Sequence, residues 1–412
     1  MNYTKKNSDL LMIVFFLLIM VNEIIIGDYG KIISGNKGLL LILVMTVVMS
    51  FRKSKVRLNN NQFSMLFLIL LLLTLMLISS FYSPMYSKEA IVAIAIFLIP
   101  LICEFRIQNN LSNNIEVFNN ICKLFLIFGN ILSIYGLTIY KFGYESIVNG
   151  SFGLSMNIGS VVLSQNVVGG SGYRIASLTA NPNTLAWFLM LTSVLSTYLL
   201  NVKQIPKFLG GFSIVIQFLS LFLTQSRGAL IATVLILTVY YFICSKHKMK
   251  FILSIIMLAS FIGLLLLKID IFSYDRVNVG LNTRGDIWKV LLESFSNNPF
   301  IGVGFGNTEN VLLSGWGRGP HNIYISLLTE IGIIGLFVFL FIMLTSIYLL
   351  VDKIKKSNKV EYIRFYTICF SIMIGIAFHQ FFEEQLMGYN LLSMFWFYLV
   401  FISIDNIGGE NL

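Results

Sequence analysis

The chain alternates between long apolar runs and short polar connectors along most of its length. A helix needs roughly 20 mostly apolar residues to cross the hydrocarbon core of a bilayer. The pattern predicts twelve membrane-spanning helices, at about 9–26, 37–51, 63–81, 88–103, 117–139, 183–200, 208–224, 228–244, 250–267, 322–351, 362–380 and 389–405. The predicted fold is all-α and polytopic, with residues 1–412 forming a single integral membrane domain.

Composition agrees with this fold class. Of the 412 residues, 57% are hydrophobic and 12% are charged, whereas a soluble domain has about 25% charged residues. The net charge of +10 could suggest a nucleic-acid partner. However, most Lys and Arg residues lie in short connectors, and no basic stripe with interleaved aromatic residues stands out, so we expect no nucleic acid.

The connectors also predict a topology. Alternate connectors carry 17 basic residues in one set and 11 in the other. Cytoplasmic loops of membrane proteins carry the excess of Lys and Arg, so both termini are predicted in the cytoplasm. The even number of spans agrees, and the first apolar run lacks a small-residue cleavage site, which favours a retained span.

This topology places two long loops outside, at about 141–182 and 268–321. The first is rich in Gly, Ser and Asn and carries no predicted helix. The second contains an amphipathic segment with apolar residues at i, i+3, i+4 and i+8: Ile287, Val290, Leu291 and Phe295. Thr283 and Asp286 resemble a capping box, so we expect a short interfacial helix that starts there.

Two arginines on the outer side are candidates for binding an anion. Arg227 lies between two spans with almost no connector, where it is either a snorkelling interface residue or part of a site. Arg284 opens the amphipathic segment, either as a solvated partner of Asp286 or as a ligand for an anion. The planar guanidinium can donate two hydrogen bonds at once to a phosphate, which favours phosphate chemistry.

Three histidines occur, and His321 is the best candidate for a general base. His247 lies in a basic cytoplasmic connector, and His379 lies near Glu383 and Glu384 at the outer end of a span. His321 follows Pro320 at the start of the tenth span, where the helix N-terminus and the nearby arginines disfavour an imidazolium. A neutral imidazole can accept a proton, although His321 could also simply cap the helix.

Two further polar residues follow His321. Asn322 could cap the same helix or donate a hydrogen bond to a ligand, and Glu330 lies in an apolar span. A buried carboxylate in a membrane needs a partner or a role, so Glu330 is either paired structurally or supports the site. No spacing indicates a metal site, a nucleotide-binding loop or a nucleophilic serine, so we expect neither metal nor cofactor.

The order of these motifs resembles one family. Arg284 is followed by W-x5-S-x4-P-x2-G-x-G-x-G, then by PHN and E-x-G-x2-G, and an upstream SRGA surrounds Arg227. The residues concerned are Trp288, Ser294, Pro299, Gly302, Gly304, Gly306, His321, Asn322, Glu330, Gly332 and Gly335. This order resembles the superfamily of O-antigen ligases and Wzy-type polysaccharide polymerases, with 215–345 as the core region.

The resemblance implies a fold like the GT-C glycosyltransferases and a metal-independent transfer reaction. The donor would be an oligosaccharide on a polyprenyl diphosphate, such as undecaprenyl diphosphate, on the outer face of a bacterial plasma membrane. By analogy, Arg227 and Arg284 would bind the diphosphate and His321 would take the proton of the acceptor hydroxyl. Trp288, Asn322 and Glu330 would complete the substrate-binding set, and 268–321 would be the loop with the catalytic motif.

The motifs do not separate the two activities of the superfamily. We favour a polymerase that joins lipid-linked repeats of a capsule, exopolysaccharide or O-antigen, because of the residue bias and the modest outer loops. A ligase that moves a finished glycan to another acceptor is the alternative. A polymerase would work with a flippase and a chain-length regulator. A flippase or other transporter is the alternative from another functional class. It predicts polar residues scattered through the spans and two matching halves, whereas the polar residues here concentrate in one outer loop and no matching halves are visible.

Overall fold

The computed structural model describes a large part of the chain. The described residues are 2–23, 58–82, 101–102, 104–105, 107–108, 111, 113–148, 151–159, 161–168, 173–179, 181–245, 274–312, 319–386 and 393–405.

Helices occupy nine of the twelve predicted spans. They are α1 (Asn2–Glu23), α3 (Asn60–Tyr82), α5 (Asn114–Phe142), α6 (Pro182–Asn201), α7 (Lys207–Leu223), α8 (Arg227–Cys244), α12 (Ile323–Lys356), α13 (Val360–His379) and α14 (Met394–Ile404). Six of them, α3, α5, α6, α8, α12 and α13, are long and apolar enough to cross a membrane. The predicted all-α, multi-pass membrane fold is therefore confirmed. Predicted spans 37–51 and 250–267, and 88–103 apart from residues 101 and 102, lie outside the described residues.

Asparagine side chains begin three of these helices. The side chains of Asn113, Asn181 and Asn322 accept hydrogen bonds from backbone N–H groups in the first turns of α5, α6 and α12. An asparagine at this position satisfies N–H groups that have no partner within the helix. Pro182 follows Asn181 at a first-turn position that needs no N–H donor.

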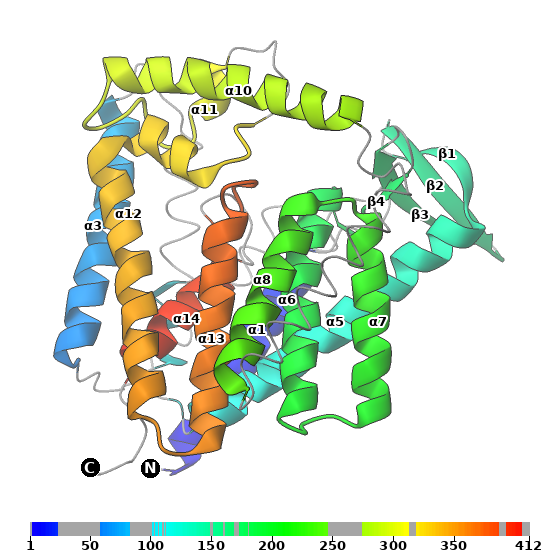
Figure 1. Ribbon diagram of the computed structural model, residues 1–412, viewed down its shortest axis with the longest axis horizontal. Helices are drawn as coiled ribbons and strands as arrows, with labels where there is room; N and C mark the ends of the chain where they lie inside the picture. Colours follow the sequence, from blue (N-terminus) through cyan, green and yellow to red (C-terminus); the bar gives the residue numbers. More distant parts are fainter. Residues whose placement is uncertain are drawn as a thin grey trace.

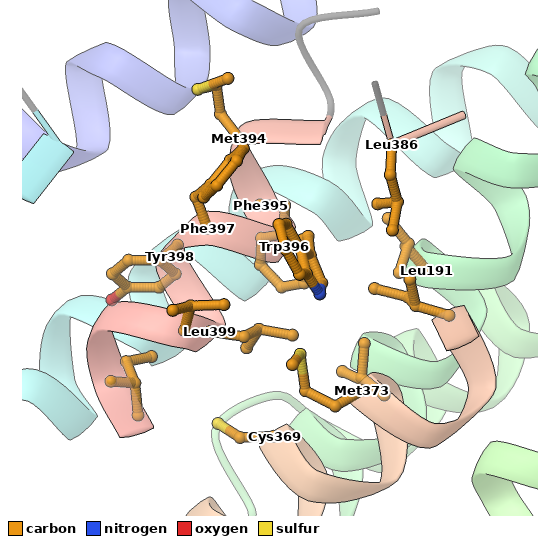
Figure 2. Packing of buried hydrophobic residues seen from close by; sticks show 14 of the residues in the cluster. Leu191, Cys369, Met373, Leu386, Met394, Phe395, Trp396, Phe397, Tyr398 and Leu399 are labelled. Atoms are coloured by element: carbon orange, nitrogen blue, oxygen red, sulfur yellow. The ribbon is translucent and has the colours of Figure 1, made fainter. Parts of the chain in front are cut away.

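The hydrophobic core takes residues from all nine of these helices. Helices α6 and α14 are the most deeply buried, since every residue of α6 from Leu185 to Leu199 and the whole of α14 are buried. Figure 2 shows Trp396 of α14 on the side of Leu191 from α6 and Met373 from α13, whereas Tyr398 contacts the ring of Phe118 of α5. By contrast, α3 keeps Phe63, Phe67 and Leu70 exposed, as expected for a helix that faces lipid.

The first outer loop contains a sheet that the sequence analysis did not predict. Strands β1 (Tyr144–Val148), β2 (Ser151–Ile158), β3 (Val161–Val168) and β4 (Arg174–Ile175) form an antiparallel meander in the order β1-β2-β3-β4. The sheet packs against the end of α5 through Leu154, which contacts Ile139. It extends to the side of the helix bundle (Figure 1).

The second outer loop contains a longer helix than predicted. Helix α10 (Tyr274–Asn297) begins nine residues before Thr283, so the expected capping box at Thr283 and Asp286 is wrong. The helix lies across one end of the bundle, with α11 (Thr308–Val311) below it, and α1 begins at the opposite end (Figure 1). Its apolar residues Ile287 and Leu291 pack against Leu312 and Ile325.

Helix α12 is broken at Gly332, where the backbone has φ 71° and ψ −175°. The segment Pro299–Gly304 fills this break. Val303 N donates to Thr329 O (2.9 Å), Gly304 N donates to Glu330 O (3.0 Å), and Ile333 N donates to Pro299 O (2.8 Å). A broken span is tolerated where other protein groups satisfy its backbone. The glycine-rich motif and the E-x-G motif are thus two sides of one backbone junction.

Candidate active site

His321 lies directly before α12, at the end of the bundle that α10 covers. Its backbone φ is 49°, which non-glycine residues rarely adopt and which costs about 1–3 kcal/mol. Its Nδ1 lies 3.0 Å from Oε2 of Glu383, and the His321 side chain keeps 26% of its surface exposed. Among the described residues Nε2 has no hydrogen-bond partner, so this atom can face a substrate.

The turn after α13 places Glu383 against His321. Gln380 Oε1 accepts hydrogen bonds from Gln385 N (2.9 Å) and Leu386 N (3.3 Å), which closes the turn around one side chain. Gln380 O also accepts a hydrogen bond from Ile323 N (3.0 Å) in the first turn of α12. These bonds join the turn to the start of α12, so the imidazole and the carboxylate are held by the same junction.

A chain of hydrogen bonds leads from Glu383 to the sheet. Asn183 Nδ2 donates to Glu383 Oε1 (2.6 Å), and one terminal nitrogen of Arg174 donates to Asn183 Oδ1 (2.7 Å). Arg174 Nε donates to Thr224 O (2.7 Å), at the turn that precedes Arg227. A single chain of hydrogen bonds therefore connects the turn after α13, α6, β4 and the α7–α8 turn.

Arg227 is the first residue of α8, and its side chain is exposed. It follows Gln225, which has φ 53° and turns the chain sharply between α7 and α8. The next residue, Gly228, lies so close to Phe382 that a Cβ atom there would be 2.8 Å from the Phe382 Cβ. Because Phe382 precedes Glu383, this contact brings the start of α8 to the turn that holds His321.

Arg284 and Trp288 lie one helical turn apart on α10, and residues at i and i+4 share a helix face. Trp288 Nε1 donates a hydrogen bond to Pro320 O (2.8 Å), next to His321. The side chain of Arg284 is half-buried. The structure thus gives Trp288 a positioning contact, and it sets Arg284 on the helix that covers His321.

Asn322 and Glu330 have structural partners. Asn322 Oδ1 accepts from Tyr324 N (3.0 Å) and Ile325 N (3.2 Å), so the side chain caps α12. Glu330 Oε1 accepts from the hydroxyl of Thr308 (2.6 Å) and from its backbone N–H (3.3 Å). Of the two readings left open for Glu330, these contacts favour structural pairing, because they fix the segment that fills the break in α12.

A second carboxylate, Glu384, lies beside the pair of His321 and Glu383. Its Oε2 accepts a hydrogen bond from Ser326 Oγ (2.6 Å), and its Oε1 lies close to Gly319, where a Cβ atom would be 2.5 Å from it. Burial raises the pKa of Glu384 to about 7 from its ordinary value of 4.5, and the charges of Glu330 and Glu383 add to the rise.

His379 is not part of the exposed site. It is buried at the end of α13, and its ring stacks on Trp187 at 5.2 Å between centroids. Of the two acidic residues that follow it, Glu383 contacts His321 and Glu384 contacts Ser326. Glu383, Asn183 and Arg174 were not among the predicted site residues, because they are separated from His321 by 62, 138 and 147 positions. The only signal was the polar stretch HQFFEE at the end of an apolar run.

The fold and this cluster define a multi-pass helical membrane protein with a histidine–carboxylate pair and arginine-bearing segments at one end of the bundle. Residues 212–340 match the model of the O-antigen ligase family. The ComP-specific O-oligosaccharyltransferase of Acinetobacter baylyi is 24% identical over 345 residues, which are 77% of this chain and 58% of that protein. Both findings support the O-antigen ligase superfamily, so the resemblance seen in the motifs is confirmed.

Proposed function

We propose that the protein is an enzyme of the O-antigen ligase type, which transfers a glycan from a polyprenyl-diphosphate carrier to an acceptor hydroxyl. The observation that carries this proposal is the contact between His321 Nδ1 and Glu383 Oε2 (3.0 Å) beside the start of α8, which bears Arg227. The family match and the relative support glycan transfer. The relative's name does not describe a polymerase, so our earlier preference for a polymerase gains no support from the comparisons.

In the proposed reaction the acceptor oxygen attacks the anomeric carbon of the lipid-linked sugar. The new C–O bond forms as the bond between that carbon and the diphosphate oxygen breaks. The acceptor proton goes to Nε2 of His321, and the electron pair of the broken bond leaves with the diphosphate. A carboxylate on Nδ1 fixes the tautomer in which Nε2 can accept that proton, and it stabilises the imidazolium that forms.

Arg227 and Arg284 are proposed to bind the diphosphate. Negative charge develops on the leaving group, and preorganised cations in a water-poor site stabilise such charge. Their fork-shaped side chains can each donate two hydrogen bonds to phosphate oxygens. We propose that these arginines take the place of a divalent cation, so that the reaction proceeds without a metal.

The proposal is tested by glycan transfer in membranes supplied with a lipid-linked oligosaccharide. We expect His321→Ala to lower the rate by about 10²–10⁴-fold, the usual contribution of general acid–base catalysis. Arg227→Lys should also be impaired, because a point charge does not replace a two-pronged donor. Lys289→Ala, at an exposed position of α10, is the control. Wild-type rates in His321→Ala would refute the site, and loss of activity with EDTA would refute metal independence.

Deletion of the protein in its host, followed by analysis of the glycans that accumulate, tests whether the protein acts as a ligase or as a polymerase. Finished glycan chains on the lipid carrier would support a ligase. Single repeats on the carrier would mean that the protein polymerises, and normal glycan products would mean that it does neither. This experiment separates the reaction type from the site, because it does not depend on any one residue.

A further inference from the structure

The sheet has one mostly apolar and one mostly polar face. The register of β1, β2 and β3 places seven apolar residues on the first face: Ile147, Phe152, Leu154, Met156, Ile158, Val161 and Leu163. The same face also carries Glu145, which accepts a hydrogen bond from the Tyr173 hydroxyl, and the buried Gln165. On the other face the hydroxyl groups of Ser146 and Ser155 are hydrogen-bonded at 2.7 Å, and Tyr144 Oη donates to Asn157 Oδ1 (3.1 Å). Side chains alternate between faces along a strand, so this sheet is amphipathic.

Only the centre of the apolar face is covered by protein. Leu154 packs with Ile139 of α5, and Met156, Leu163, Tyr135 and Tyr173 surround them. At one end of the face Ile147, opposite Phe152, is 81% exposed, and at the other end Ile158 is 57% and Val161 56% exposed. A single exposed apolar residue needs no explanation, but Ile158 and Val161 lie opposite each other on the face that packs on α5.

The sheet follows α5 directly in the chain and packs against the end of this helix. Helix α5 is long and apolar enough to span a membrane, and it exposes an apolar stripe at spacings of three to eight residues: Ile127, Ile131, Ile134 and Phe142. At 3.6 residues per turn, Tyr135 and Ile139, which carry the sheet, lie on the neighbouring face of α5. Lys141, Phe142 and Tyr144 follow at the end of the span, and such residues are typical of the membrane–water boundary.

We propose that the sheet is a membrane anchor whose exposed apolar residues Ile158 and Val161 insert into the lipid surface beside the end of α5. Its Ser- and Asn-bearing face points to water. The anchor is connected to the site, because β4 carries Arg174, which bonds to Thr224 O and Asn183. Lipid contact by the sheet therefore fixes the depth of the site relative to the lipid headgroups, where the diphosphate of a lipid-linked donor would lie.

Two adjacent residues provide a matched test. Val161 and Val162 are 56% and 61% exposed, but they point to opposite faces of β3. The full chain, with its four native cysteines replaced by serine, would carry Val161→Cys or Val162→Cys and a nitroxide label. In vesicles of phosphatidylethanolamine and phosphatidylglycerol, electron paramagnetic resonance measures collisions of the label with oxygen, which enters lipid, and with a water-soluble nickel chelate.

We expect the label at 161 to collide several times more often with oxygen than with the chelate, and the label at 162 to show the reverse. Equal access of the chelate to both labels would refute the anchor. Shielding of the label at 161 from both reagents would also refute it, since a protein surface such as a second copy of the chain would then cover the sheet. If the cysteine-free chain does not reconstitute, Val161→Trp and Val162→Trp in the native background replace it. Brominated lipids should then quench the added fluorescence only at 161.

Discussion

Glu383 orients His321, because its carboxylate contacts Nδ1 of the imidazole ring. If His321 accepts the acceptor proton, Glu383→Gln should lower kcat on the order of 10²-fold and leave KM nearly unchanged, because the lost interaction acts in the transition state. The amide retains the shape of the side chain and a hydrogen bond to Asn183. Glu383→Asp, which keeps the charge, should recover part of the rate. The measurement is glycan transfer with varied donor concentration.

Two results would contradict this role for Glu383. An unchanged kcat in Glu383→Gln would mean that the carboxylate does not serve the reaction. A fall in thermal stability that accounts for all lost activity would mean that it serves only the fold. Glu293→Gln, on the exposed side of α10, is the control for the loss of one negative charge at this end of the bundle.

The neighbouring residue Glu384 should make the stability of the fold depend on pH. Its pKa is about 7 in the folded protein and 4.5 when the residue is exposed, as in the unfolded chain. Between pH 4.5 and 7 the folded state therefore binds more protons than the unfolded state does. Stability should then fall as pH rises from about 4.5 to 7, and the loss is complete above pH 7. Glu384→Gln should raise Tm at pH 8 and change it little at pH 4.5, measured in detergent.

The difference in Tm between Glu384→Gln and the parent protein should depend on pH, and this dependence assigns the effect to the charge of Glu384. Glu293→Gln, at an exposed position, should show no such gain at pH 8. A rise in Tm for Glu384→Gln of the same size at both pH values would mean that packing, rather than the buried charge, limits stability.

At the scale of elements, the break in α12 depends on Gly302, which lies against the backbone of Glu330, and on Gly332, which lies against the backbone of Phe300. Gly302 has φ 79°, and a Cβ there would collide with the carbonyl group of Glu330. We expect Gly302→Ala to lower Tm strongly, because the strain of about 1–3 kcal/mol at positive φ adds to the collision. Gly306 has φ 77° with open space around its α-carbon, so Gly306→Ala isolates the cost of φ alone.

The comparison of these two variants tests whether close packing of the segment Pro299–Gly304 against the break in α12 stabilises the fold. Gly302→Ala should be clearly less stable than Gly306→Ala in thermal unfolding. An equal fall in Tm would mean that the close approach to α12 contributes nothing.

The sequence predicted those elements whose pattern is local. Spans such as 117–139 and 183–200 are continuous apolar runs, and helices α5 and α6 lie there. The sheet was missed because Gly, Ser and Asn dominate residues 141–182, although Leu154, Met156 and Ile158 alternate with the period of two that is typical of a strand. The break at Gly332 was also missed, since it depends on Pro299, 33 residues upstream.

The site shows the same limit. The sequence indicated His321, Arg227 and Arg284 because only 12% of the residues in this largely hydrophobic chain are charged. Glu383 could not be paired with His321 in advance, since the contact depends on how α13 ends beside the start of α12. Only the folded chain brings such distant positions to hydrogen-bond distance.

At the scale of the whole molecule, the proposed function requires α10 and His321 to lie outside the cell. Beyond the break at Gly332, α12 continues over residues 333–356; these 24 residues at 1.5 Å each give about 36 Å, which exceeds a hydrocarbon core of about 30 Å. Its first turn lies beside His321, and its last turn carries Lys353, Lys355 and Lys356. Because such lysines remain in the cytoplasm, the two ends of α12 should lie on opposite sides of the membrane.

Cysteine labelling in intact cells tests this orientation. Lys289→Cys on α10 and Asn358→Cys between α12 and α13 are both at exposed positions. A membrane-impermeant maleimide should label position 289 in whole cells and position 358 only after the membrane is permeabilised, with the parent chain reporting the native cysteines. The opposite pattern would place the arginines and His321 in the cytoplasm. The site would then be out of reach of a donor on the outer face, and the proposed reaction could not take place there.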